Sequence, residues 1–353
     1  MKVKEVKQRM AERFRVGIVG LGRVASTIQD EVTGYAGRML LPYSHTHAYA
    51  AVPQTHVCAV ADIDTQKTAA YVEQWQPVFG EIAAYASYEE MLQAENLDIV
   101  SVCTHAPLHA PVTQAAARAG AKAVFCEKAI ATSLAEADAM IGVCDEHNVK
   151  LVVNHTRRWD PYYETALALI QDGRIGNVRT ISAHFAGELV HTGIHWLDAM
   201  LTFSQSTPAW VTGGLASGAD VALDAGGTAY VGFHNGVMGF IDGQSGPIFE
   251  IDVIGTAGRL RLSNSDAEFF TFDSATRTMV KRPFPLVTYP RSGMQGAVED
   301  IVRCIEHDRP SRSDGRAGRA ALELALAVYA SHASNGARVQ LPLAERERTV
   351  LSR

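Results

Sequence analysis

The sequence predicts an α/β protein of two domains, an N-terminal doubly wound parallel sheet and a C-terminal α/β domain with a large, mainly antiparallel open sheet. In residues 1–153, short apolar runs rich in β-branched residues alternate with helix signals, which is the pattern of βαβ units. In residues 154–353, strand-like runs follow one another without regular intervening helices. A chain of 353 residues is long enough to bury two hydrophobic cores.

Composition and charge argue against several classes of protein. The net charge of −6 is unfavourable for binding nucleic acid or an anionic membrane surface, and no apolar run approaches the roughly 20 residues of a membrane span. The five cysteines form no CxxC pair, so we expect neither a metal site nor disulfides. Residues 1–12 are charged, are typical of a solvated leader and lack the apolar core of a signal peptide, so the prediction is a cytoplasmic protein.

The first predicted strand, residues 14–19, runs into a glycine turn. Gly20 permits the tight turn, Gly22 lets the backbone approach a pyrophosphate, and the small Ala25 lets a helix pack close to the strand. That helix begins within residues 26–29, and its first amide groups would bind phosphate. Glycine turns also occur for packing alone, so this turn leaves dinucleotide binding open.

Asp62 ends the second predicted strand, residues 57–62. Its carboxylate could accept hydrogen bonds from the adenosine ribose and repel a 2′-phosphate, which favours NAD over NADP. The interval from Gly20 to Asp62 is about twice the roughly 20 residues that are usual. We assign the excess to an insertion at residues 30–44, before a helix through residues 47–51. The alternative is that Asp62 is an ordinary turn residue.

The remaining elements of each domain follow from periodicity and capping. Ser87 with Glu90, and Ser133 with Glu136, have the spacing of a capping box, and Asp160-Pro161 is a strong helix start. Further strands and helices of the first domain are expected at residues 98–103, 110–119, 123–126, 135–147 and 149–153. In the second domain we expect a helix to about residue 173, strands at 178–185, 229–233, 237–242, 249–255, 260–262 and 269–272, a hairpin turn at 234–236, and helices at 294–306 and 317–334.

Two groups of polar residues could carry chemistry. Lys128 follows a strand at the predicted cofactor edge, where its ammonium group could stabilise a developing alkoxide, although it could also be a surface lysine. His191, His195 and Asp198 have i, i+4 and i+7 spacing, so they would share one face of a helix. A neutral histidine there could be a general base. Two structural histidines, or a zinc site, are the alternatives.

In their order along the chain, these segments resemble the glucose–fructose oxidoreductase/inositol dehydrogenase (Gfo/Idh/MocA) family over nearly the whole chain. The matching segments are 20–25, 61–62, 104–109, 127–128, 157–161, 193–198, 253–258 and 339–343. The resemblance implies an N-terminal NAD-binding Rossmann domain at residues 1–153. It also implies a substrate-binding and oligomerisation domain at residues 154–353.

The resemblance also implies an activity and its residues. The activity would be nicotinamide-dependent oxidation of a secondary hydroxyl of a sugar, sugar derivative or cyclitol, in a homo-oligomer (dimer or tetramer) formed through the C-terminal sheet. The expected catalytic residues are Lys128, His195 and His191, and the same three with Arg157 would contact substrate. The expected NAD-binding residues are Gly20, Leu21, Gly22, Arg23, Val24, Asp62, Ile63, Thr104, His105, His109, Glu127 and Lys128.

The chain departs from the family pattern in three places. Ala129 replaces the proline of the family's Glu-Lys-Pro, and His105-Ala106 replaces the Pro-Asn of its Thr-Pro-Asn. His191 stands where the family usually has a carboxylate, four residues before the histidine, and a neutral imidazole polarises His195 less strongly than a carboxylate. Two other functions stay open: NAD-dependent glycoside cleavage through transient oxidation and elimination, and a non-catalytic sugar or NAD sensor.

Overall fold

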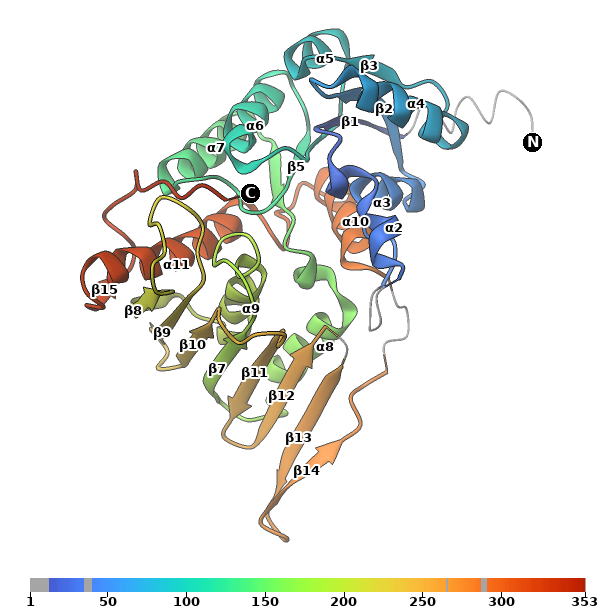
Figure 1. Cartoon of the computed structure of the whole chain (residues 1–353). Coiled ribbons are helices and arrows are strands. Elements are labelled where there is room, and N and C mark those ends of the chain that lie inside the picture. The colour runs from blue at the N-terminus through green and yellow to red at the C-terminus, as the bar shows by residue number, and fades with distance from the viewer. Residues whose placement is uncertain (1–12, 35–39, 265, 287–290, 353) are drawn as a thin grey trace.

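The structure, a computed structural model, describes residues 13–34, 40–264, 266–286 and 291–352. These residues form two sheets with helices packed between and around them (Figure 1). The predicted leader, residues 1–12, and residues 35–39 of the predicted insertion lie outside the described residues. None of the helices in the described ranges is both long and apolar enough to cross a membrane.

The N-terminal sheet is the predicted doubly wound parallel sheet. Within the described residues it has six strands in the order β3-β2-β1-β4-β5-β6, and every neighbouring pair is parallel. The strand order reverses between β1 and β4, which is where such sheets bind their ligands. Its strands are β1 (Phe14–Val19), β2 (Thr55–Ala61), β3 (Ala83–Tyr85), β4 (Ile99–Val102), β5 (Ala123–Cys126) and β6 (Lys150–Val153).

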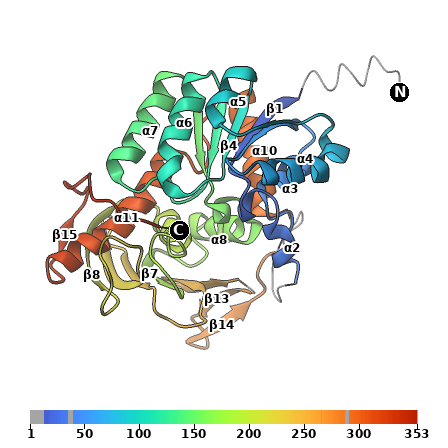
Figure 2. The same cartoon turned by 45° about the horizontal axis from the view of Figure 1, so that its top comes forward.

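Helices cover both faces of this sheet (Figure 2). One face packs on α5 (Tyr88–Ala94), α6 (His109–Arg118) and α7 (Leu134–Glu146). The other packs on α3 (His45–Ala51), α4 (Thr65–Phe79) and α10 (Gly293–Glu306). Helix α10 comes late in the chain, yet its apolar side packs on the N-terminal sheet. The predicted domain boundary at residue 153 remains a prediction. Helix α10 follows this boundary in the sequence but packs on the sheet that precedes it.

The second sheet is mainly antiparallel, as predicted. Its order within the described residues is β14-β13-β12-β11-β7-β10-β9-β8-β15, and only the β10–β7 pair is parallel among its described ladders. Its strands are β7 (Val178–His184), β8 (Pro208–Leu215), β9 (Gly227–Phe233), β10 (Met238–Asp242), β11 (Glu250–Gly255), β12 (Gly258–Ser263), β13 (Ala267–Asp273), β14 (Thr278–Arg282) and β15 (Val339–Gln340).

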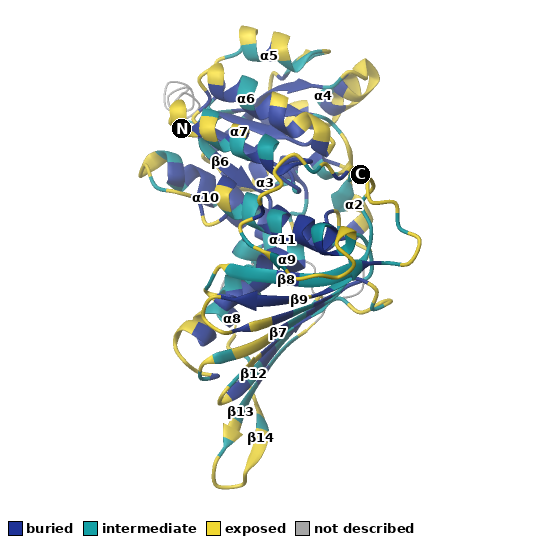
Figure 3. Ribbon diagram, turned by 90° about the vertical axis from the view of Figure 1, so that its left-hand side faces the viewer, coloured by how far each residue is buried: buried dark blue, intermediate teal, exposed yellow. Residues whose placement is uncertain are grey.

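One face of this second sheet carries the helices that lie between the two sheets. These are α8 (Pro161–Gln171), α9 (Ile194–Ser204) and α11 (Gly315–Ala333), which pack on β12, on β7 and β11, and on β8 and β9 respectively. Figure 3 shows this sheet below the helices, with exposed residues concentrated towards β13 and β14. Tyr230, on the face opposite the helices, is 55% exposed. The open sheet that the sequence predicts is therefore present.

Local sequence signals predicted most helix starts correctly. Ser133 accepts a hydrogen bond from the Glu136 amide, and Asp160 accepts from the amides of Tyr162 and Tyr163. Four strands, β3, β8, β14 and β15, and helix α4 were not predicted. Strand β8 contains Gly213-Gly214 and looks like a turn, while β14 is mostly exposed and polar. Both are held by pairing with neighbouring strands, which periodicity does not reveal.

The glycine turn is followed by two short helices. A 3-10 helix, η1 (Arg23–Ala25), comes first, and α2 (Ile28–Val32) begins at the predicted place. Ser26 interrupts them, and its hydroxyl accepts a hydrogen bond from the Trp75 indole at 3.0 Å. The predicted insertion then leads into α3, which begins at His45, two residues before the expected helix.

Candidate active site

The glycine turn and Asp62 meet at the end of β1. The Leu21 amide donates to Asp62 Oδ2 at 2.7 Å, and the Asp64 amide donates to Oδ1 at 2.9 Å. Gly20 has φ +85°, and a Cβ there would lie 2.9 Å from the Thr104 side chain, so the turn requires glycine. A Cβ on Gly22 would meet no atom within 4 Å, so the turn is open on that side, as a phosphate cradle requires.

The loops after β4 and β5 lie beside this turn and are joined by His109. Its two ring nitrogens lie 2.7 Å from the Ala129 carbonyl oxygen and 2.9 Å from that of Thr104. Burial lowers the pKa of His109, although both carbonyl groups oppose the change. His105 lies on this loop, and the Thr104 hydroxyl is buried without a hydrogen-bonding partner among the described residues. An unpaired buried hydroxyl at this edge fits a site built for a ligand.

Glu127 is buried in an ion pair that the sequence did not reveal. Its Oε1 atom lies 2.8 Å from His45 Nε2 and accepts a hydrogen bond from Asn154 at 2.5 Å. Burial alone would raise the pKa of Glu127, but the His45 hydrogen bond and charge lower it to about 2. Burial would lower the pKa of His45, but Cys103 and Glu127 beside its ring raise it to about 10. The other ring nitrogen of His45 lies 2.7 Å from Ser101 Oγ.

Lys128 reaches from the N-terminal sheet to the segment before α9. Its ammonium group donates to the His191 carbonyl oxygen at 2.8 Å, and its peptide bond to Ala129 is cis. Burial lowers the pKa of Lys128, while the carboxylates of Glu127 and Asp224 oppose the change. A partly buried ammonium group at the carboxyl edge of the sheet is suited to stabilise a developing negative charge.

The predicted helical face of His191, His195 and Asp198 is only partly correct. Helix α9 begins at Ile194, so His195 and Asp198 lie on it, whereas His191 lies in the preceding turn. Gly193, packed against the ring of Phe185 and the Leu189 carbonyl, leaves no room for a side chain at this helix start. The i, i+4 geometry therefore does not hold for His191, whose side chain is exposed.

His195 is held neutral by its surroundings. Burial is the main reason that its pKa lies well below the usual value, and the nearby positive groups of Arg157 and Lys128 lower it further. Its Nδ1 atom is buried without a hydrogen-bonding partner among the described residues, while the side chain as a whole is partly exposed. A neutral, partly exposed imidazole beside an ammonium group can accept a proton from a hydroxyl group.

Asp198 follows His195 on α9, and Arg157 lies close to His195. The guanidinium of Arg158 donates to both carboxylate oxygens of Asp198, and His155 Nδ1 lies 3.2 Å from Asp198 Oδ1. The guanidinium of Arg157 stacks 4.1 Å from the centre of the Trp196 ring, and its Nε donates to the Tyr163 hydroxyl at 3.2 Å. The stacking and this hydrogen bond hold Arg157 close to His195.

Asp224 is a second carboxylate that the sequence did not single out. It accepts hydrogen bonds from the amides of Val190 and His191 at 2.9 and 2.6 Å, and from Ser352 near the end of the chain. Burial raises the pKa of Asp224, and these hydrogen bonds oppose that change. Asp224 thus fixes the turn that carries the carbonyl bound by Lys128. No local motif marks it, because its partners are distant in the sequence.

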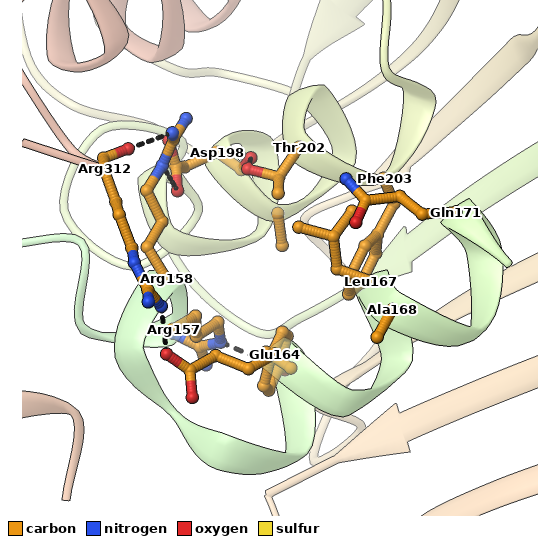
Figure 4. Close-up of a pocket in the computed structure, with 12 residues that line it drawn as sticks. Arg157, Arg158, Glu164, Leu167, Ala168, Gln171, Asp198, Thr202, Phe203 and Arg312 are labelled. Atoms are coloured by element: carbon orange, nitrogen blue, oxygen red, sulfur yellow. Dashed lines mark hydrogen bonds and ion pairs between the residues drawn. The ribbon is translucent and has the colours of Figure 1, made fainter. Parts of the chain in front are cut away.

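A cavity of about 250 Å³ lies between α8 and α9 (Figure 4). Arg158 and Asp198 form its polar end, and Leu167 and Phe203 form its apolar end. Neither Lys128 nor His195 lines it. We therefore locate the candidate active site by the meeting of the glycine turn, Lys128 and His195, not by this cavity. No group of three or more His, Cys, Asp or Glu side chains suited to a metal ion occurs among the described residues.

A doubly wound sheet with a glycine turn at its switch point, facing a lysine and a neutral histidine, defines a nucleotide-dependent oxidoreductase. Residues 14–155 match the model of the Gfo/Idh/MocA family, described as an oxidoreductase family with an NAD-binding Rossmann fold. This match bears out the predicted resemblance for the N-terminal domain. The match also bears out the predicted NAD cofactor and the predicted class of NAD(P)-dependent dehydrogenase.

Characterised relatives extend the similarity beyond the N-terminal domain. The chain is 29% identical to D-apiose dehydrogenase of Paraburkholderia graminis, over 86% of this chain and 88% of the relative. It is 27% identical to inositol 2-dehydrogenase of Rhizobium meliloti, over 90% and 96% of the two chains. The crystal structure of aldose-aldose oxidoreductase from Caulobacter crescentus has the same fold, with a TM-score of 0.77 at 22% identity over 93% of this chain and all of that one.

Proposed function

We propose that this protein oxidises a secondary hydroxyl of a sugar, sugar derivative or cyclitol, with His195 as the general base and Lys128 stabilising the alkoxide. The observation that carries the proposal is the approach of Lys128 to the start of α9, where its ammonium group binds the backbone four residues before His195. Both side chains are partly exposed, whereas Glu127 and Asp198 beside them are buried. A substrate hydroxyl between them would therefore meet one proton acceptor and one fixed positive charge.

The glycine turn and the neighbouring loops would hold the cofactor. Bound NAD would supply the acceptor for the hydride that leaves the substrate carbon. Thr104 and His105 lie on the loop beside the turn, and His109 and Glu127 act through that loop and the strand end behind it. The residues proposed to contact NAD directly are Gly20, Leu21, Gly22, Arg23, Val24, Asp62, Ile63, Thr104, His105 and Lys128.

The charges of the side chains assign the direction of proton transfer. His195 is neutral at neutral pH because burial and its cationic neighbours lower its pKa, so it is ready to accept a proton. Lys128 is a cation below its lowered pKa and would favour the alkoxide over the hydroxyl. Arg157, fixed on Trp196, would add a second positive charge near the substrate.

We also propose a homo-oligomer formed through the open face of the second sheet. Tyr230 and Phe240 lie on adjacent strands of this sheet, with ring centres 5.1 Å apart, and Trp210 on β8 stacks under the Arg338 guanidinium. Tyr230 is more than half exposed. Aromatic residues on an open sheet face are typical of a protein–protein interface.

The experiment is a spectrophotometric assay of NADH formation with a panel of aldoses, uronic acids and inositols, with the products identified separately. The proposal expects NADH and a keto product or lactone from at least one member, with NADP a poorer oxidant. Release of an aglycone from a glycoside without net NADH would instead indicate elimination after transient oxidation. Binding of sugar and NAD with neither product would indicate a sensor. Either result would overturn the proposal.

A further inference from the structure

His155, just beyond β6, has no role in the chemistry proposed above, yet it is buried beside the base. Its Nδ1 atom lies 3.2 Å from Asp198 Oδ1 and 3.4 Å from Ser313 Oγ. Its Nε2 atom is buried and has no hydrogen-bonding partner among the described residues. A buried polar atom without a partner destabilises a fold, so its retention needs an explanation.

The explanation lies in the neighbouring ring of His195. The two ring centres are 6.4 Å apart and their planes are inclined at 78°. His195 Nδ1 is the second buried nitrogen in this region that lacks a partner within the described ranges. The rings are too far apart for a direct hydrogen bond, but one water molecule between two such nitrogens would satisfy both.

The protonation states make these two nitrogens complementary. Burial alone would raise the pKa of Asp198, but His155 and Arg158 hold it well below its usual range, so the carboxylate is ionised. His155 Nδ1 then donates to Asp198, and a His155 ring that carries only this hydrogen has a lone pair on Nε2. If His195 accepts the substrate proton through Nε2, its own Nδ1 carries hydrogen and needs an acceptor.

We propose that His155 is a positioning residue, whose Nε2 accepts the Nδ1 hydrogen of His195 through one buried water while Asp198 holds the His155 ring. The inference rests on the proposed role of His195 as the base. In this arrangement Asp198 and His155 orient the His195 ring. His191, which lies in the turn before α9, does not have this role. The water-bridged contact with His155 would also stabilise the imidazolium that forms when His195 takes up a proton.

The groups that face the two rings are defined. His195 is surrounded by Arg157, Lys128, His155 and His191, and a positive charge on any of them disfavours its protonation. His155 faces Asp198 on α9, Ser313 on the segment before α11, and His195. Arg158 binds Asp198 on its other side. Among these groups, Asp198 alone carries a negative charge, and it contacts the His155 ring.

Three variants test the proposal through rates and their pH dependence. H155F keeps the ring shape but removes the acceptor, so we expect kcat to fall by about 10-fold or more while KM changes little. The acid limb of the rate profile should move to lower pH, because loss of the acceptor lowers the pKa of His195. H155Q restores an amide donor and an oxygen acceptor, and should recover part of the rate. S313A, which removes the other neighbour of His155 Nδ1, is the matched control and should behave as wild type.

Nitrogen-15 NMR of the histidine rings tests the same point without turnover. Resonances of His155 and His195 can be assigned with H155Q and H195A. The proposal expects hydrogen on Nδ1 of His195 in wild type and a mixture of tautomers in H155F. A wild-type His195 with hydrogen on Nε2, or one unchanged by H155F, would overturn it. Failure of every substrate in the NADH assay would instead count against the proposed function and leave the NMR result to decide this inference.

Discussion

Two buried carboxylate–histidine pairs flank the candidate active site, and they differ in one respect. Glu127 on the N-terminal sheet pairs with His45, whose second ring nitrogen is bound by Ser101. Asp198 on α9 pairs with His155, whose second ring nitrogen has no partner in the described part of the chain. The first pair is closed by hydrogen bonds at both ends. The second is open at Nε2 of His155, whose ring lies beside that of His195.

The difference indicates how the two pairs serve the site. A closed buried pair fixes the ends of β4, β5 and α3 relative to one another, so its loss should chiefly affect stability. An open pair next to a catalytic base influences protonation, so its loss should chiefly affect rate. Lys128 follows directly after Glu127, and His195 lies three residues before Asp198. Each of the two proposed reacting side chains, Lys128 and His195, is therefore close in the sequence to the carboxylate of one pair.

The largest expected effect on stability comes from breaking the closed pair. Glu127→Ala leaves His45 charged and buried without its counter-ion, and should lower the free energy of unfolding by about 3–5 kcal/mol. Denaturant unfolding measures this. His155→Phe is the matched control, because Asp198 keeps its hydrogen bonds from Arg158. Equal losses of stability in the two variants would remove the distinction between the pairs.

The closed pair also predicts how stability depends on pH. The pKa of Glu127 is lowered from 4.5 to about 2, so its contribution is present above pH 4.5 and is lost as pH falls towards 2. The pKa of His45 is raised from 6.5 to about 10, so its contribution is present below pH 6.5 and is lost as pH rises towards 10. Glu127→Ala should therefore lose most stability, relative to wild type, between about pH 4.5 and 6.5.

Lys128→Met tests the reacting side chain attached to the closed pair. The substitution keeps the length of the side chain but removes the charge that stabilises the alkoxide, so kcat should fall by about 10²-fold or more. The melting temperature should change little, because only one hydrogen bond, to the His191 carbonyl, is lost. Near-normal turnover would remove Lys128 from the mechanism.

Asp62→Ser tests the cofactor end of the site. Asp62 belongs to neither of the two carboxylate–histidine pairs. Removing the carboxylate should narrow the preference for NAD over NADP, because the ribose 2′-phosphate no longer meets a negative charge. Titration of both cofactors into wild type and variant measures the ratio of dissociation constants. Equal affinities in the wild-type protein would contradict the role of Asp62.

The smallest expected effect is that of His191→Asp, which places a carboxylate in the turn before α9. Activity should be retained, and the acid limb of the rate profile should move to higher pH, because a nearby negative charge favours the imidazolium of His195. His191→Ala should lie between wild type and His195→Ala in rate. An unmoved profile in His191→Asp would show that this turn is electrostatically separate from His195.

Sequence patterns predicted the fold well because its signals are local. The glycine turn after β1, the Asp160-Pro161 helix start and the hairpin at Gly236 each follow from a few adjacent residues. The pairs that distinguish the site are not local. His45 reaches Glu127, and His155 reaches Asp198, only after the sheets are assembled. Periodicity also placed His191 on a helix, whereas α9 begins only at Ile194.

We propose that His195 and Lys128 together form the reacting centre of an NAD-dependent dehydrogenase. Single-turnover formation of NADH by wild type and His195→Ala, with saturating NAD and a substrate found in the panel, examines this proposal. We expect NADH to form rapidly in wild type and the chemical step to be lost in His195→Ala, with binding of NAD unchanged. NADH formation at the wild-type rate in His195→Ala would contradict it, and the base would have to be another residue.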